Sequence, residues 1–157
     1  MGTTEIRTAL KSILQAADAT ALVHDFERWT NEPKEYVALF KPATENKLKA
    51  WVFAPESEQD VPFTQESHAH LTVWRVRFLA SLVDGEATEK TALAIVETAQ
   101  ALIRQNLTLN GSCWSCRPTV GPQKGQVGLA IDSWKLAFIG PVLCHLADGR
   151  LTTQTFV

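Results

Sequence analysis

The last part of the chain alternates apolar and polar positions with the period of a β-strand. Between residues 143 and 156 the side chains switch sides at every step, with one interruption at Gly149, after which the alternation resumes from Leu151. A strand of this length would expose a long edge if it were unpaired, and exposed edges invite aggregation. We therefore predict that this final strand is paired inside a sheet.

Helical spacing dominates three other segments. A first helix is predicted from Thr3 or Thr4, either of which can cap it, with an apolar face formed by Ile6, Leu10, Ile13, Leu14 and Ala17. A short helix is predicted to start at Pro33 and to stop before Pro42. The longest helix is predicted over residues 86–106, capped by Asp84 or Thr88, with a stripe made of Leu93, Val96, Ala99, Leu102 and Ile103.

The remaining ordered segments are predicted to be strands. Their ranges are 21–29, 49–53, 68–83, 112–120 and 127–139, and the strand at 68–83 is apolar on both faces of its pleat. Residues Glu56–Ser67 mix acidic and polar residues with Pro62, and we expect them to form a mobile loop. Several strands with one long helix and one or two shorter N-terminal helices indicate an α+β fold with a mostly antiparallel sheet.

Composition places the chain among ordinary globular domains. It has 157 residues, 45% hydrophobic and 20% charged, which suits a single domain spanning residues 1–157. The formal net charge of −2 argues against a dedicated nucleic-acid binder. The sequence contains no apolar run near the ~20 residues that a membrane helix needs. The first residues lack the basic and apolar blocks of a signal peptide, so synthesis in a reducing cytoplasm is expected, in keeping with three cysteines.

A pair of cysteines is the first candidate for chemistry. Cys113 and Cys116 form a CxxC pattern, and Cys144 precedes His145 further along. A structural zinc site needs four ligands that converge tetrahedrally, whereas neighbours on a strand point to opposite faces. A thioredoxin-like thiol pair would sit at a helix N-terminus, and no helix is predicted after Cys116. A zinc or thiol-redox module built on Cys113 and Cys116 is the alternative function, and we assign no metal ligand.

The histidines give two further alternatives. His68 and His70 share one face of a strand, yet no cysteine or carboxylate follows at a ligand-like spacing. His24, Asp25 and His145 would make an acid–base site only if the fold brought them together. No serine lies in a nucleophile elbow and no glycine-rich phosphate loop is present. We therefore expect no enzyme activity, no catalytic residue and no cofactor.

Short segments at both ends of the chain form a recognisable order of motifs. The sequence Val23–Trp29 (VHDFERW) is followed by Tyr36–Phe40 (YVALF) and by the predicted strand around Trp51. This order is similar to the N-terminal half of a group of phage and prophage structural proteins, in which a VHDYERW-type strand precedes a short helix. The closing residues Phe138–Gln154 resemble the final strand pair of that group. The order of elements is similar to that of tail terminator, or tail completion, proteins of long-tailed bacteriophages, with neck and minor tail proteins as the neighbouring alternative.

The resemblance implies a structural role in the virion tail or neck, assembled in the cytoplasm of the bacterial host. Proteins of this family form a ring, typically hexameric, on the tail tube, stop its polymerisation and present a surface to the head-completion or connector protein. The partners implied are therefore other copies of the chain, the tail tube protein and the connector, with DNA passing through the channel without specific binding. Five tryptophans are many for this length, and one or two are expected at an interface.

Overall fold

The computed structural model describes residues 2–156 and contains three α-helices and five strands among them. The helices are α1 (Thr3–Ala17), α2 (Pro33–Ala38) and α3 (Thr88–Gln105), with a short 3₁₀ turn η1 (Asp84–Glu86) before α3. The strands are β1 (Leu22–His24), β2 (Lys49–Pro62), β3 (His68–Ser81), β4 (Leu129–Ile139) and β5 (Val142–Phe156). The predicted α+β class is confirmed.

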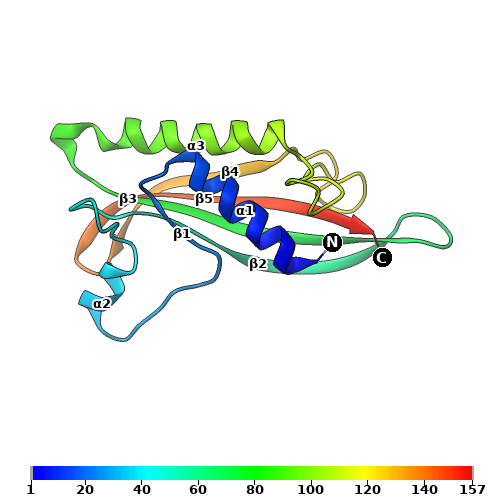
Figure 1. The fold of residues 1–157 in the computed structure, drawn as a ribbon, viewed down its shortest axis with the longest axis horizontal. Helices are drawn as coiled ribbons and strands as arrows, with labels where there is room; N and C mark the ends of the chain where they lie inside the picture. Colours follow the sequence, from blue (N-terminus) through cyan, green and yellow to red (C-terminus); the bar gives the residue numbers. More distant parts are fainter. Residues whose placement is uncertain (1, 157) are drawn as a thin grey trace.

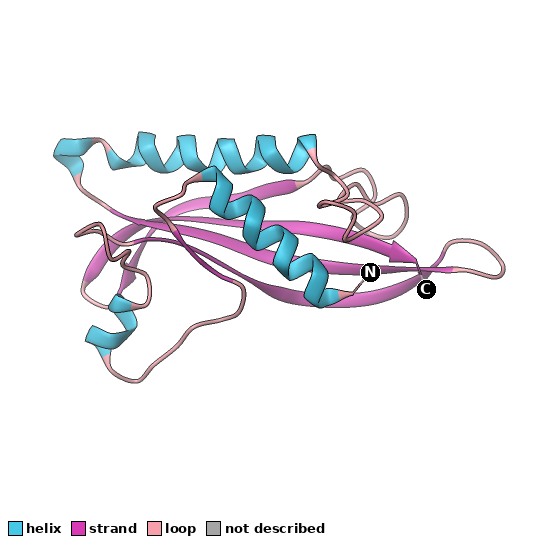
Figure 2. Ribbon diagram, viewed as in Figure 1, coloured by secondary structure: helices cyan, strands magenta, loops and turns pink. Residues whose placement is uncertain are grey.

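All five strands form one sheet (Figure 2), and their order in it is β1-β2-β3-β5-β4. β1 is parallel to β2, and the other three pairings are antiparallel. β5 lies between β3 and β4, pairing with β3 over residues 144–156 and with β4 over residues 142–151, so the prediction that the final strand is paired inside the sheet is confirmed. The two ends of this order, β1 and β4, are therefore the edges of the sheet.

Helices α1 and α3 lie side by side on one face of the sheet (Figure 1). The main core between them and the strands contains the largest buried side chains, including Trp51, Trp74, Phe53 and Phe78. On the opposite face α2 covers a smaller core around Phe40, Leu79 and Cys144. β3 is thus apolar on both faces, as its sequence predicted, because each face has its own cover.

Gly149 sits where β5 passes very close to its neighbour β4. A side chain at this position would bring its Cβ to 2.5 Å from the backbone oxygen of Ala130 and 2.9 Å from Ile131. The register of β4 against β5 shifts between Ile131 and Ser133, so Asp132 is an extra residue in a β-bulge. The glycine therefore allows the bulged strand to approach, and β5 continues through it without a break.

The structure corrects two strand predictions on the N-terminal side. β1 is only three residues long, because the chain leaves the sheet at Asp25, whose carbonyl oxygen accepts a hydrogen bond from Arg7. β2 does not end at Pro55, since a register shift between Pro55 and Ser57 accommodates the proline and pairing with β3 continues to Pro62. The segment Glu56–Ser67 is therefore strand up to Pro62, and the hairpin turn follows; its mobility stays a prediction.

A third predicted strand, residues 112–120, is a loop. Cys113 and Cys116 donate their backbone N–H groups back to the carbonyls of Thr108 and Leu107, which winds the chain into turns. Only Ser115 makes an isolated bridge, to Gln154 at the end of β5. The predicted turn at residues 122–125 is present, and β4 begins at Leu129.

The predicted helix caps also differ from the observed ones. α1 is capped at Gly2, whose N–H is bonded by the Glu5 carboxylate at 2.8 Å. α3 begins at Thr88 after Ala87, a non-glycine residue with a φ of +50°. The Thr88 hydroxyl instead accepts a hydrogen bond from the N–H of Val83, 2.9 Å away, and so fixes the turn that leads into the helix.

Candidate assembly surface

The edge strand β4 exposes a row of large apolar side chains. Trp134, Leu136 and Phe138 are 39%, 56% and 71% exposed. They pair with Ala147, His145 and Leu143 of β5 and lie on the same face as α1 and α3. Within residues 2–156, β4 pairs with β5 alone, so its other edge also presents unpaired backbone groups.

The β-bulge at Asp132 decides which side chains form this row. Before the bulge, Leu129 and Ile131 point to the helix-covered face and contribute to the main core. The extra residue shifts the alternation by one, so Trp134 and its two apolar partners stay on that same face. These three side chains lie beyond the stretch of the sheet that α3 covers. They therefore form an exposed apolar row beside the helix and are not buried beneath it.

A cleft of about 700 Å³ separates this row from the N-terminal half of α3. Leu93 of α3 forms the opposite apolar wall; it was predicted to be on the buried stripe but is exposed here. On the floor, Nε2 of His145 lies 3.1 Å from the Thr88 hydroxyl. The rim is charged, with lining residues Asp84, Glu89, Lys90 and Lys135. An apolar interior with a polar rim is typical of protein-binding surfaces.

A second exposed aromatic group lies at the other edge of the sheet. Phe26 and Trp29 are 51% and 74% exposed in the connection between β1 and α2. This connection swings away from the sheet at the bottom of Figure 1. Its base is held by ion pairs from Asp25 to Lys11 and from Glu27 to Arg77. We call residues 25–32 the aromatic segment.

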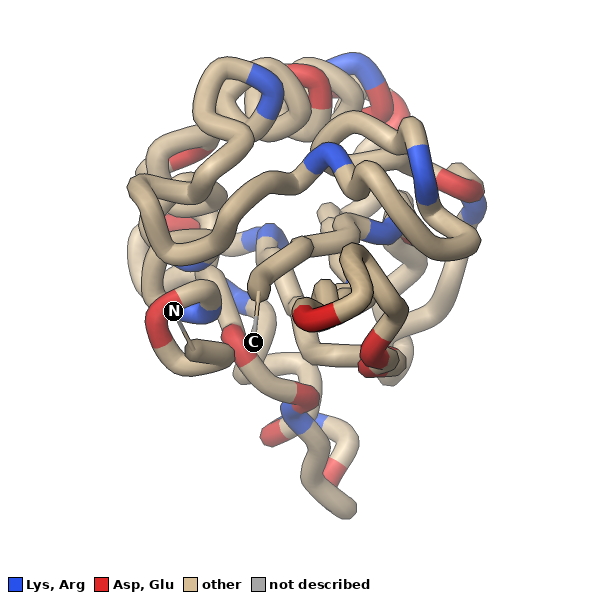
Figure 3. Tube along the Cα trace, turned by 90° about the vertical axis from the view of Figure 1, so that its right-hand side faces the viewer, with Lys and Arg blue, Asp and Glu red and all other residues tan. Residues whose placement is uncertain are grey.

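Several charges on the open face of the sheet are paired. On the sheet face opposite α1 and α3, Arg75 binds Asp148 (Nη2 to Oδ2, 2.6 Å) and Glu56, and Arg150 binds Asp132. The hydrogen bonds and charge of Arg75 hold the pKa of Asp148 below its usual range, against the smaller opposing effect of burial. Basic and acidic residues are interspersed along the trace in Figure 3. A single-sign patch of the kind that binds phosphate is therefore not formed by these strands.

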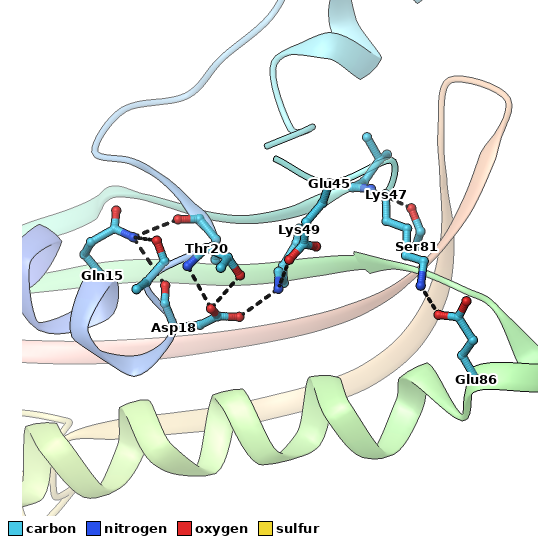
Figure 4. A network of polar contacts seen from close by, with 11 residues as sticks. Gln15, Asp18, Thr20, Glu45, Lys47, Lys49, Ser81 and Glu86 are labelled. Atoms are coloured by element: carbon cyan, nitrogen blue, oxygen red, sulfur yellow. Dashed lines mark hydrogen bonds and ion pairs between the residues drawn. The ribbon is translucent and has the colours of Figure 1, made fainter. Parts of the chain in front are cut away.

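A polar network joins the end of α1 to the start of β2 (Figure 4). The Lys49 ammonium lies 3.0 Å from Asp18 and 2.9 Å from Glu45. Burial acts to lower the pKa of Lys49, but the bonds and charges of Glu45 and Asp18 outweigh it and raise that pKa. Every charged group in this network has a partner, which makes it a structural clamp for α1 and not a binding site.

The structure places the cysteines in two separate cores. Cys113 and Cys116 are buried in the main core with their sulfur atoms 3.9 Å apart. Cys144 belongs to the smaller core on the opposite face, where burial raises its pKa to about 11. A hydrogen bond from Cys116 lowers the pKa of Cys113, and that contact together with burial raises the pKa of Cys116. Among residues 2–156, no three His, Cys, Asp or Glu side chains are grouped closely enough to hold a metal ion.

The histidines are also kept apart. His24 lies on the α2 side of the sheet, bonded to the Leu39 carbonyl at 2.6 Å, whereas His145 faces the cleft on the other side. Three strand spacings, ~14 Å, further separate β1 from β5. Asp25 is engaged with Lys11. His70 bonds Asp60 at 2.7 Å, and its neighbour His68 is exposed. The acid–base site that would need His24, Asp25 and His145 together is therefore not assembled.

Sequence patterning found only part of the exposed aromatic surface. Trp29, Trp114 and Trp134 are exposed, while Trp51 and Trp74 are in the core. The expectation that one or two tryptophans lie at an interface stays a prediction. Phe26 and Phe138 both belong to a strand-like alternation, a pattern that indicates a strand but does not by itself predict exposure. Phe138 lies close to Gly140 in the tight β4–β5 turn. This position next to a hairpin turn is the sequence feature that could have indicated its exposure.

Comparison of the sequence with models of protein families and with curated proteins finds no match. None of the described helices is long and apolar enough to cross a membrane.

Proposed function

We propose that this protein is a structural assembly protein of a long-tailed bacteriophage or prophage. In this role it forms a ring on the end of the tail tube, terminates tube polymerisation and offers a joining surface to the head connector. The observation that carries the proposal is the pair of exposed aromatic surfaces on opposite edges of one sheet, at β4 and beside β1. The resemblance of residues 23–40 and 138–154 to tail terminator proteins supplies the biological setting.

Ring formation suits this distribution of apolar surface. A ring needs a heterologous interface, in which one patch of a subunit meets a different patch of the next. Two patches on opposite edges satisfy that need, whereas a single patch would favour a closed dimer. An enzyme would instead concentrate convergent polar groups in its cleft, and the cleft beside α3 is largely apolar within.

The charge distribution supports a channel through which DNA passes. Strong DNA binding requires Lys and Arg to neutralise phosphates. Here 15 basic residues are outweighed by 17 acidic ones, and the arginines of the open sheet face are paired with carboxylates. The protein would therefore surround DNA without retaining it.

Tube capping is the test of this function. Purified protein is added to polymerising tail tube protein from the same genome, and the tubes are measured by negative-stain electron microscopy. We expect a ring at one end of each tube and a tube length that stops increasing after addition. Tubes that elongate at the same rate with bare ends would contradict the proposal.

A further inference from the structure

We propose that the aromatic segment of one copy, residues 25–32, docks into the α3–β4 cleft of the next copy, with Trp29 as its anchor. This inference rests on the proposed function, because it specifies which surfaces meet in the ring. It commits to a second copy of this chain as the occupant of the cleft.

The exposed areas agree with such an interface. Large apolar side chains offer roughly 150–250 Å² each. The exposed fractions therefore correspond to ~300 Å² on the aromatic segment and ~400 Å² on the β4 row together with Leu93. A stable interface buries about 800 Å² per partner, of which somewhat more than half is apolar. The two patches are therefore close in size to each other and to the apolar centre of one standard interface.

The charges of the two surfaces permit the contact. Asp25 and Glu27 of the aromatic segment are already paired with Lys11 and Arg77 of their own copy, and the cleft carries Lys90 beside Asp84 and Glu89. The contact therefore rests on the aromatic side chains that fill the apolar interior, and not on attraction between the two surfaces.

The positions of the surfaces determine the kind of assembly. The segment follows β1 and the cleft adjoins β4, the two edges of the sheet, so each copy has one donor and one acceptor surface. Repetition of such a contact gives a ring or an open filament and not an isologous dimer. The competing arrangement, two β4 edges pairing with each other, would use the cleft strand of both copies and leave Trp29 outside the contact.

A mixing experiment separates these arrangements. The segment variant is Trp29→Asp and the cleft variant is Leu136→Asp; both side chains are more than half exposed, so the fold tolerates the changes. Val127→Asp is the matched control, because it adds the same charge at an exposed apolar position outside the cleft. Each protein is studied by analytical ultracentrifugation up to 500 µM, alone and as an equal mixture of the two variants.

We expect wild type and the Val127→Asp control to form the same closed oligomer. Each interface variant alone should lose association at least thirtyfold, the effect of removing a central hot spot. The mixture should form a heterodimer and stop there, because the intact segment of one variant fits the intact cleft of the other and no further contact remains. Wild-type assembly that survives Trp29→Asp would overturn this inference and leave the ring function intact. A wild-type chain that is monomeric throughout would overturn the inference, and tube capping would then decide the function separately.

Discussion

Replacing Gly149 by alanine should destabilise the protein strongly, although the change adds a single methyl group. The new Cβ would lie 2.5 Å from the Ala130 oxygen and 2.9 Å from the Ile131 side chain. Carbon and oxygen atoms in contact need more than 3 Å, and the nearer obstacle is backbone that is held in the β4–β5 ladder. The two strands must therefore move apart at the bulge.

The expected cost follows from this geometry. Overpacking a core by one methyl group costs about 1–3 kcal/mol, and the rigid backbone neighbour places Gly149→Ala near the upper end. Each kcal/mol shifts the melting temperature of a domain this size by about 2–4 °C. We therefore expect a decrease of about 6–12 °C, measured by circular dichroism melting and checked by urea unfolding.

Gly85→Ala is the matched control for this experiment. A Cβ at Gly85 meets no atom within 4 Å, and its backbone lies outside the left-handed region. The control should melt within about 2 °C of wild type, or slightly higher because alanine restricts the unfolded chain. If Gly149→Ala melted as late as the control, the close approach of β4 and β5, and with it the bulge that sets the exposed apolar row, would be refuted.

Two further substitutions test the buried polar contacts. Asp148→Asn should lower the free energy of unfolding by about 1.5 kcal/mol at pH 7. Arg75 lowers the pKa of Asp148 in the folded protein. The ion pair therefore stabilises the fold fully above the ordinary aspartate pKa of about 3.9, and this stabilisation is lost as the pH falls through the lower pKa of the folded state. Urea unfolding should therefore show a smaller difference in free energy of unfolding between Asp148→Asn and wild type at pH 3 than at pH 7. A difference that is the same at both pH values would contradict the role of the Asp148 charge. Thr153→Val removes the hydroxyl that accepts a hydrogen bond from the indole N–H of Trp74 at 3.0 Å. In the same assay it should lower the free energy of unfolding by about 1–3 kcal/mol. Thr153→Ser keeps the hydroxyl and should lower it less, and equal losses for the two variants would argue against the hydrogen bond.

Much of the fold could be predicted because several elements have a complete local pattern. Val96, Ala99 and Ile103 of the predicted α3 stripe are buried, as helical periodicity requires, whereas Leu93 at its start is exposed. β5 was recognisable from its alternation even across Gly149. In both cases each residue's environment is determined by its own element, which is the situation in which sequence patterning succeeds.

The errors arose where contacts outside the segment itself decided the structure. The outer half of β2 has polar residues on both faces, so alternation gives no signal there, and pairing with β3 makes it a strand. Residues 112–120 have strand-like composition, yet their backbone groups are taken by turns around Leu107 and Thr108. The sequence of these segments permits both outcomes, and tertiary contacts select one.

The candidate surface was predictable only in part for a similar reason. Alternation at Trp134, Leu136 and Phe138 indicates a strand with one apolar face, but the same pattern describes a buried strand. Exposure results from the path of α3, which leaves this end of β4 uncovered. The position of β4 at the sheet edge likewise depends on the insertion of β5 between β3 and β4.

The central claim is that copies of this chain close into a ring through opposite edges of the sheet, and a native mass spectrum of the wild-type protein at 100 µM tests it most directly. The spectrum reports subunit number and bound metal in one measurement. We predict a closed oligomer of six subunits with the mass of the bare polypeptide. A metal-bearing monomer would contradict the account and favour a zinc module at Cys113 and Cys116.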